Sequence, residues 1–369
     1  MAEQTQDSWL GSRLRADPLT AGFVVIGILF FLDLIRRLAT GAVGLDTVAT
    51  FLWSGIVFGM AIGLAGIGLA MTYSILQFAN FAHGDLITAG AFAGWSSTFV
   101  IVGFGQIATE ILLLVGQPAR ISSQLGISVT TQPLAIVAGF VVSVLFAAGL
   151  AVGFDRVVFR PMRDQSGIAL LIASVGIALA LRHLIQFIYQ PSTPSVVHDP
   201  EVPRQAVPVG SGSFTINAHQ ITLVVVALLL MIGIHLLLQY TKLGTAMRAM
   251  ADNEDLAKIT GISTEKVVLY TWLIGGGLTG AAGYLLALEQ GFLDLTLGWD
   301  ILLVIFAGVI LGGIGSIYGA IVGGLTIGIV SQLSIVWLPS EFTTVAAFVI
   351  MIAVLLVRPN GIFGGVTSV

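Results

Sequence analysis

Ten long apolar segments, separated by shorter polar ones, occupy most of this 369-residue chain. Each approaches the length of about 20 residues that an α-helix needs to cross the apolar core of a bilayer. The runs are unbroken rather than alternating, which favours helices over the strands of a membrane barrel. The sequence therefore predicts an all-α integral membrane protein, a polytopic helical bundle of about ten transmembrane helices. The predicted spans are residues 19–35, 51–73, a segment that follows Asp85 and ends at Phe104, 134–154, 166–188, 221–239, 267–288, 301–317, 318–338 and 342–357.

Composition supports this class of protein and excludes several kinds of site. Hydrophobic residues make up 56% of the chain and charged residues 9%, with a mean hydropathy of +1.01, whereas soluble domains carry about 25% charged residues. The absence of cysteine excludes disulfides and thiolate metal sites. Five histidines without ligand spacing give no reason to expect a metal site. In the second span, glycines recur about one turn apart, at positions 55, 59, 63 and 66, which allows close helix approach in lipid.

The distribution of basic residues predicts the orientation. When the polar segments are assigned to alternate sides of the membrane, one side receives ten basic residues and the other four, and the richer side is expected to be cytoplasmic. Both termini and the loop 240–266 are then cytoplasmic, and the proline-rich segment 189–220 is external. Residues 1–18 are polar and carry acids, unlike a cleaved signal peptide. Residues 1–47 are thus expected to form a cytoplasmic segment and the first transmembrane helix. Arg182 falls within a span, where its long side chain is expected to reach the headgroups.

The loop 240–266 is the most charged run between two long apolar segments. Good helix formers lie between Gly244 and Gly261, so we expect one short helix over residues 245–259 with a glycine beyond its end. Met247, Met250 and Ala251 share one face, and charged residues share another. Such a helix can press into a groove on a soluble partner. Spacing alone fits an ordinary solvated loop equally well.

Two motifs resemble those of a known family. TKLGTAMRAMADNEDLAKITGI, residues 241–262, resembles the cytoplasmic coupling loop of the branched-chain amino-acid type ABC permeases, a family that includes urea and short-amide importers. ANFAHGDLITAG, residues 79–90, resembles the family's other signature. The resemblance covers residues 48–365, and the segment before it matches nothing known.

The resemblance implies a permease subunit, not an enzyme, in a prokaryotic cell membrane. Its implied partners are membrane lipid, a second related permease, two cytoplasmic ABC ATPases and an extracytoplasmic binding protein, with no nucleic acid. Its implied substrates are branched-chain or other apolar amino acids, with urea or short amides as the alternative. No cofactor is expected, because ATP is used by the separate ATPase subunits. Consistent with this, the chain has no Gly-Lys pair and hence no P-loop.

The candidate site residues form two groups. The coupling role is expected of Gly244, Met247, Arg248, Met250, Asp252, Glu254, Asp255 and Gly261. A substrate-pathway role is weighed for Asn80, His83, Gly84, Asp85, Glu289 and Asp300. No catalytic or metal-binding residue is expected.

Plainer interpretations of the second group remain open. The polar patch of residues 80–85 is either a helix break that lines a cavity or a turn near the cytoplasmic face, in which Asp85 accepts from amides of the first helical turn. Glu289 and Asp300 bracket a predicted external segment, where each can simply face water. An ion-coupled secondary transporter is the rival from another class. It would need a carboxylate at the middle of the membrane, and the acids here all lie near the ends of predicted spans.

Overall fold

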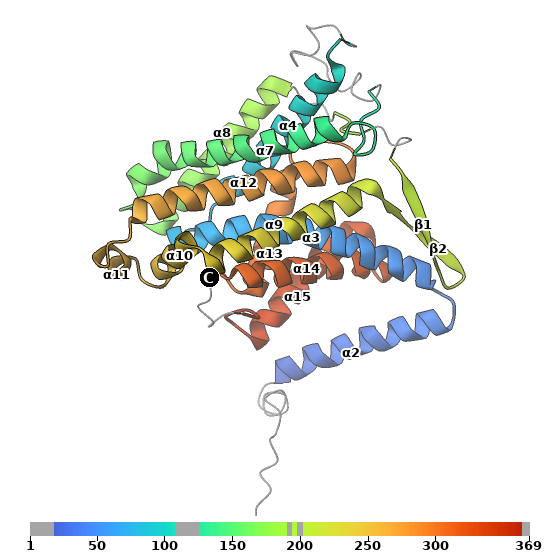
Figure 1. Ribbon diagram of the computed structural model, residues 1–369. Helices are drawn as coiled ribbons and strands as arrows, with labels where there is room; N and C mark the ends of the chain where they lie inside the picture. The colour runs from blue at the N-terminus through green and yellow to red at the C-terminus, as the bar shows by residue number, and fades with distance from the viewer. Residues whose placement is uncertain (1–17, 106, 108–124, 190–193, 198–201, 364–369) are drawn as a thin grey trace, which may run out of the picture.

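The chain folds into a bundle of apolar helices (Figure 1). The computed structural model describes residues 18–105, 107, 125–189, 194–197 and 202–363. Eight helices in this part of the chain are long and apolar enough to cross a membrane, and α2 and the shorter α13 bring the apolar helices to the ten expected. The all-α, multi-pass prediction is confirmed. The bounds are α2 (Pro18–Ala39), α3 (Leu45–Leu76), α4 (Ala82–Gly103), α7 (Pro133–Phe154), α8 (Gly167–Tyr189), α9 (Ala218–Tyr240), α12 (Thr264–Gln290), α13 (Leu297–Gly312), α14 (Ile317–Leu333) and α15 (Thr343–Val357).

Helices α3, α4 and α12 form the centre of the bundle. Most of their side chains are buried, whereas α8, α9 and α15 are mainly exposed. The close helix approach predicted from the glycine spacing of α3 is confirmed, because the backbone of α14 lies directly against these glycines. A Cβ atom added to Gly59 would stand 2.8 Å from the Cα of Leu325, and one added to Gly55 would stand 2.7 Å from the Cα of Ile329. These contacts bring two apolar helices together without side chains between them.

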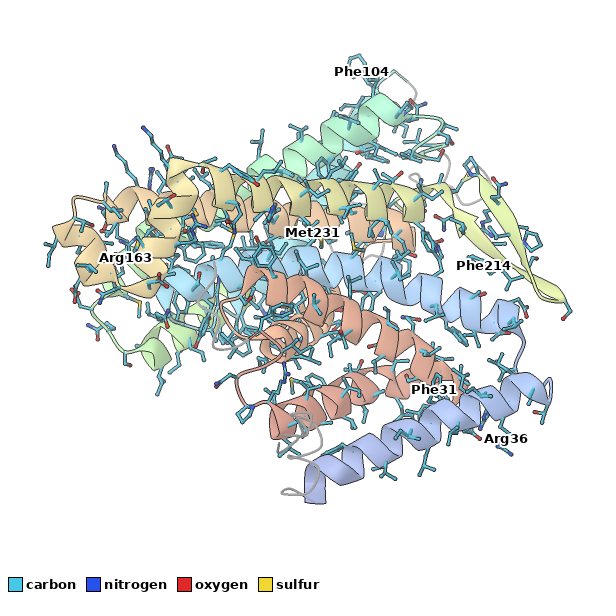
Figure 2. The ribbon with its side chains drawn as sticks, turned by 60° about the horizontal axis from the view of Figure 1, so that its bottom comes forward. Phe31, Arg36, Phe104, Arg163, Phe214 and Met231 are labelled. Atoms are coloured by element: carbon cyan, nitrogen blue, oxygen red, sulfur yellow. The ribbon has the colours of Figure 1, made fainter. Side chains whose placement is uncertain are left out.

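The two ends of the bundle differ in structure. We call them the loop end, which carries α10 (Lys242–Asp252) and α11 (Glu254–Ile259), and the hairpin end, which carries the antiparallel strands β1 (Arg204–Val209) and β2 (Gly212–Asn217). Arg163 and Phe214 mark these opposite ends in Figure 2. The apolar valines of the proline-rich segment 189–220 predict that it packs against another part of the chain, and Val196, Val197 and Val202 are buried. The hairpin itself was not predicted. The sequence also predicts an external connection with a partial helix over residues 105–133, and this segment lies mainly outside the described residues.

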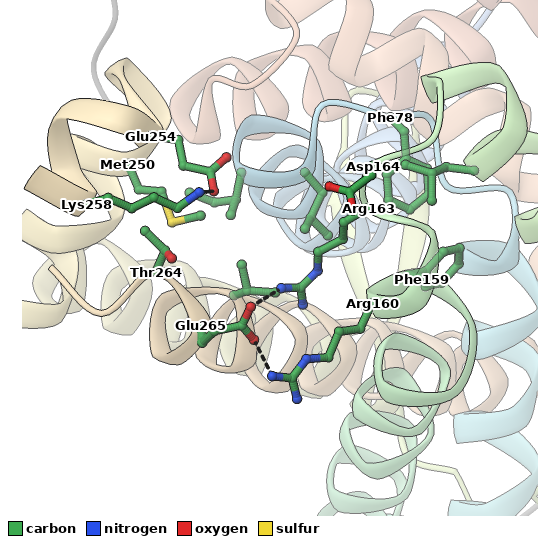
Figure 3. A pocket seen from close by; sticks show the side chains of 14 residues that line it. Phe78, Phe159, Arg160, Arg163, Asp164, Met250, Glu254, Lys258, Thr264 and Glu265 are labelled. Atoms are coloured by element: carbon green, nitrogen blue, oxygen red, sulfur yellow. Dashed lines mark hydrogen bonds and ion pairs between the residues drawn. The ribbon is translucent and has the colours of Figure 1, made fainter.

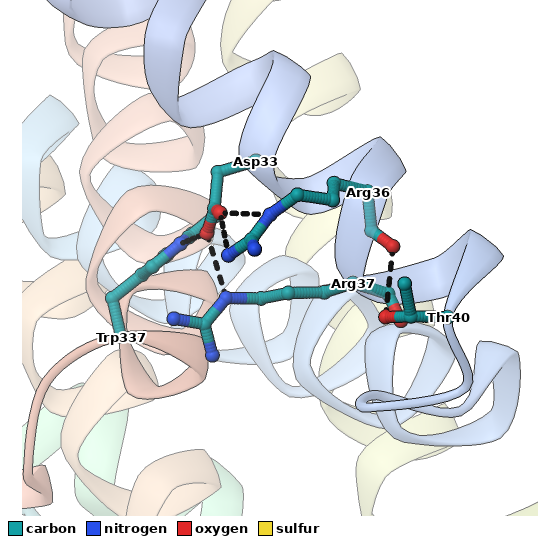
Figure 4. A network of polar contacts seen from close by, with 5 residues as sticks. All are labelled: Asp33, Arg36, Arg37, Thr40 and Trp337. Atoms are coloured by element: carbon teal, nitrogen blue, oxygen red, sulfur yellow. Dashed lines mark hydrogen bonds and ion pairs between the residues drawn. The ribbon is translucent and has the colours of Figure 1, made fainter.

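Helix α2 lies at the edge of the bundle and leaves much of its apolar surface exposed. A polar contact near its end joins it to the rest of the chain (Figure 4). Both oxygens of Asp33 accept from side chains: Oδ1 from Arg36 Nε at 3.0 Å, and Oδ2 from Arg37 Nε at 2.6 Å and from Trp337 Nε1 at 2.9 Å. Trp337, which follows α14 and its short 3₁₀ turn, also contacts the ring of Phe30. Asp33 therefore links α2 to the hairpin end.

Candidate functional site: the loop end and a buried ion pair

The loop 240–266 forms two helices rather than the single one expected over residues 245–259. The backbone of Asn253 is extended, so it breaks the helix, and its Oδ1 then accepts from the amide of Leu256 at 2.9 Å, which caps α11. Asparagine is among the best residues for this position, and its place before Glu254 and Asp255 was an available signal. Thr241 caps α10 in the same way. Gly261 follows α11 with φ at +87°, as its expected place beyond the helix end requires.

The residues with an expected coupling role differ in how far they are buried. Gly244, Met247 and Met250 are buried and hold α10 against the bundle. Arg248 is half-buried and donates through Nη1 to Oε1 of Gln239 at 3.1 Å. The exposed members are Asp252, Glu254, Asp255 and Gly261. None of this tests the coupling role itself, which stays a prediction.

Two exposed apolar residues that sequence reasoning missed lie on α11. Leu256 is 57% exposed and Ile259 is 83% exposed, while Ala257 between them is buried. Their spacing of three residues on one face after the helix break was the available signal. Beside them, Glu254 pairs with Lys258 at 2.9 Å, and this carboxylate raises the pKa of Lys258 above its ordinary value. The loop end therefore presents an apolar pair surrounded by charges.

An ion-pair network joins the α7–α8 connection to the start of α12 (Figure 3). Glu265 pairs with Arg163 at 2.7 Å and with Arg160 at 3.2 Å, and Arg163 also pairs with the nearly buried Asp155 at 3.0 Å. A cavity of about 460 Å³ lies between this network and α11, lined also by Lys258. The α7–α8 connection, α12 and the loop 240–266 thus meet at one place.

Helix α4 begins inside the bundle rather than at its end. The amide of Phe81, just before α4, donates to Oγ of Ser174 at 3.0 Å. Ser174 lies seven residues beyond Gly167, so this contact is about 10 Å into α8. Residues 80–85 therefore lie inside the bundle, and the pathway role of this polar patch stays a prediction. Gln77 makes the early turn possible with its left-handed backbone at φ 54°.

The polar residues at the start of α4 are all buried. Asn80 Oδ1 accepts from the amide of Ala82 at 3.1 Å. His83 Nε2 lies 3.0 Å from the carbonyl oxygen of Ala65 in α3. Gly84 faces the backbone of Gly298, close enough that an added Cβ would stand 2.8 Å from its carbonyl oxygen. These contacts build the bundle around α4.

Asp85 forms a buried ion pair with Arg182 of α8. Arg182 Nε donates to Oδ1 at 3.0 Å and Nη2 donates to Oδ2 at 2.9 Å, in the bidentate geometry that suits a carboxylate. The Asp85 side chain is 0% exposed and that of Arg182 is 17% exposed. The Arg182 Cζ atom also lies 4.5 Å from the ring centroid of Trp299. The expectation that Arg182 reaches the headgroups was therefore wrong, because a partner 97 residues away in the chain holds it in the bundle.

The first turn of α13 meets α4 at a similar depth. The amide of Gly298 donates to Oγ1 of Thr88 at 3.0 Å, although α12 has just ended at the hairpin end. The chain after Gln290 therefore turns back into the bundle. Asp300 is exposed in this turn, where it accepts from Oγ1 of Thr296 at 2.7 Å. The turn itself was not predicted, since hydropathy reports the length of an apolar run and not the depth at which it begins.

Glu289 lies apart from the other pathway candidates. It is half-buried near the end of α12 and accepts from Nε2 of Gln220 at 3.3 Å. A cavity of about 200 Å³ beside it is lined also by His219. In the described part of the chain, no group of three or more histidine or acidic side chains is placed to hold a metal ion. Of the six pathway candidates, the structure brings Asn80, His83, Gly84, Asp85 and Asp300 to the region where α4 and α13 begin.

These features define a class of protein: a multi-pass helical membrane protein with a charged polar loop at one end and an ion pair inside the bundle. The chain belongs to the family of permease components of branched-chain amino acid transport systems, whose pattern matches residues 51–355. It is 29% identical over 319 residues to the high-affinity branched-chain amino acid transport system permease protein LivH of Salmonella typhimurium. The aligned region covers 85% of this chain and 94% of LivH.

Other relatives carry similar names. The permease protein BraD of Pseudomonas aeruginosa is 28% identical over 314 residues, 84% of this chain and 94% of BraD. A probable branched-chain amino acid transport permease protein of Methanocaldococcus jannaschii is 31% identical over 319 residues, 84% of this chain and 90% of the relative. No solved structure matches the chain. Helix α2 lies outside the family match, as expected for residues that resembled nothing known.

Proposed function

We propose that this chain is the membrane-spanning permease subunit of an ABC importer, and that it carries branched-chain or other apolar amino acids into a prokaryotic cell. The observation that carries the proposal is the match with relatives named as branched-chain amino acid permeases, which extends over 84–85% of the chain. The transporter would contain a second related permease, two ABC ATPases and an extracytoplasmic binding protein that delivers the substrate.

In this proposal the loop end faces the cytoplasm. The ten-to-four distribution of basic residues supports that orientation, since basic residues concentrate in cytoplasmic loops. The ATPase would receive α11, with Leu256 and Ile259 entering an apolar cleft and the neighbouring acids setting the orientation. Closure of the ATPase would then move α12 and the α7–α8 connection together, because Glu265 ties them to each other.

Isolation of the chain from its native membrane in mild detergent tests the assembly. We expect a P-loop ATPase, a second permease and a binding protein to be recovered with it. Proteoliposomes that contain this complex should take up leucine when ATP is supplied, and isoleucine and valine should compete. Uptake of urea or a short amide, without competition by leucine, would replace the substrate class. ATP-independent uptake driven by an ion gradient would overturn the importer proposal.

Charge reversal at Arg248 tests the docking role of the coupling loop. Arg248→Glu removes the contact with Gln239 and places an acid beside the proposed interface. We expect uptake to fall at least about fivefold, as it would if docking of the ATPase became weaker by about 1 kcal/mol. Membrane insertion should be unchanged. Arg358→Glu, the same change at the end of α15, is the matched control. Normal uptake by a well-expressed Arg248→Glu variant would count against the docking role.

A further inference from the structure

The guanidinium of Arg182 occupies a position at which a charge is costly. Arg182 lies 15 residues beyond the start of the 23-residue helix α8, which places its Cα about 22 Å along a segment of about 34 Å. A charged group at such a depth needs a partner and an environment other than lipid. Asp85 supplies the partner on one edge of the guanidinium and Trp299 covers one face. Arg182 is nevertheless not fully covered.

Trp299, against whose ring the Arg182 guanidinium lies, begins an exposed strip of α13. Trp299 is 36% exposed and Leu303 is 51% exposed, and the half-buried Phe306 continues the same side of the helix one turn further. The ring of Phe306 lies 5.4 Å from that of Phe81, so the strip reaches the start of α4. Apolar side chains alone would suit lipid tails, but this strip begins beside a cation. A cation next to apolar side chains suits a small molecule with a negative group and an apolar body.

We propose that Arg182 binds the carboxylate of the transported amino acid within the membrane, and that Trp299 and Leu303 contact its apolar side chain. This inference rests on the proposed function and assigns the residues that recognise the substrate in the permease itself. Asp85 is the positioning residue: its bidentate contact orients the guanidinium and leaves the remaining N–H groups for a second carboxylate. Asp300, the residue after Trp299, is exposed and would favour a ligand that also carries an ammonium group.

The test needs a variant that removes the charge of Arg182 without leaving the buried carboxylate of Asp85 unpaired. The double variant Asp85→Asn, Arg182→Gln replaces the ion pair with two neutral amides that can still hydrogen-bond. His183→Gln, at the next and exposed position of α8, is the matched control. Thermal unfolding of each complex reports whether the bundle is intact. Arg182→Lys is a second variant, which keeps the charge but lacks the planar bidentate geometry.

The measurement is binding of labelled leucine to the whole transporter in nanodiscs, without the binding protein, in competition with unlabelled leucine and leucinamide. Leucinamide lacks only the carboxylate. We expect the wild type and His183→Gln to prefer leucine over leucinamide by about 10-fold or more, as for one hydrogen bond to a charged group. The double variant should lose that preference, and Arg182→Lys should show less of it than the wild type.

Two outcomes would overturn the inference. One is an intact double variant, or Arg182→Lys if the double variant does not fold, that prefers leucine as strongly as the wild type does. The other is absence of any leucine binding to the wild type. Failure of the proposed function has a different signature, since the wild-type complex with its binding protein and ATP would then take up no apolar amino acid.

Discussion

Gly324 provides a quantitative test of the close contact between α3 and α14. A Cβ atom at this position would stand 2.6 Å from the amide nitrogen and 2.7 Å from the Cα of Gly63. Ordinary contacts of a Cβ lie between 3.4 and 4 Å, so alanine would overlap the partner helix by about 1 Å. Both partner atoms belong to the backbone and cannot rotate away. The two helices would have to separate and lose the packing contacts that hold helices together in lipid.

The expected cost of Gly324→Ala follows from that overlap. Overfilling a well-packed contact costs about 1–3 kcal/mol, which lowers the ratio of folded to unfolded protein by about 5- to 150-fold. The cost exceeds the gain of about 1 kcal/mol or less that alanine brings to a helix in place of glycine. The net effect is destabilisation.

The assay is thermal unfolding of the purified chain in mild detergent, followed by loss of the monodisperse peak in size-exclusion chromatography. Gly233→Ala in α9 is the control, because a Cβ there would meet nothing within 4 Å. We expect the control to unfold at the wild-type temperature or slightly above it, and Gly324→Ala to unfold several degrees below it. Equal unfolding temperatures for the two variants would refute the argument from backbone contact.

Two further predictions concern the loop end. Asn253→Ala removes the side-chain cap of α11 and should lower the local stability of this helix by about 1 kcal/mol. We expect faster hydrogen exchange of the α11 amides, and unchanged exchange would contradict the capping role. Glu265→Gln weakens the contacts with Arg160 and Arg163. Exposed ion pairs add little to stability, so we expect unchanged unfolding but fewer amino acids imported per ATP. Glu341→Gln, at an exposed acid before α15, should change neither quantity. If Glu265→Gln imports as many amino acids per ATP as the wild type, Glu265 does not transmit ATPase closure from α12 to the α7–α8 connection.

The loop 240–266 shows what the periodicity of a sequence can and cannot predict. Charge, helix propensity and the glycine at position 261 predicted a helical segment of about the right extent. The side chain of Asn253 competes for backbone groups in its own helix, which is a local effect, and it divides the segment in two. Met247 and Met250 were correctly placed on one face. Periodicity states that two residues share a face but not what that face packs against, and in the structure it packs against the bundle.

The amino-acid sequence by itself determined the class of this protein and its ten apolar helices, because each needs only a local run of apolar residues. It also indicated the close helix contact, since the glycine spacing along α3 is local too. Tertiary structure alone decided the pairing of Asp85 with Arg182 and the depth at which α4 and α13 begin. An apolar run records how much of a helix avoids water. The partner of a charge within it depends on segments that are distant in the chain and adjacent only after folding.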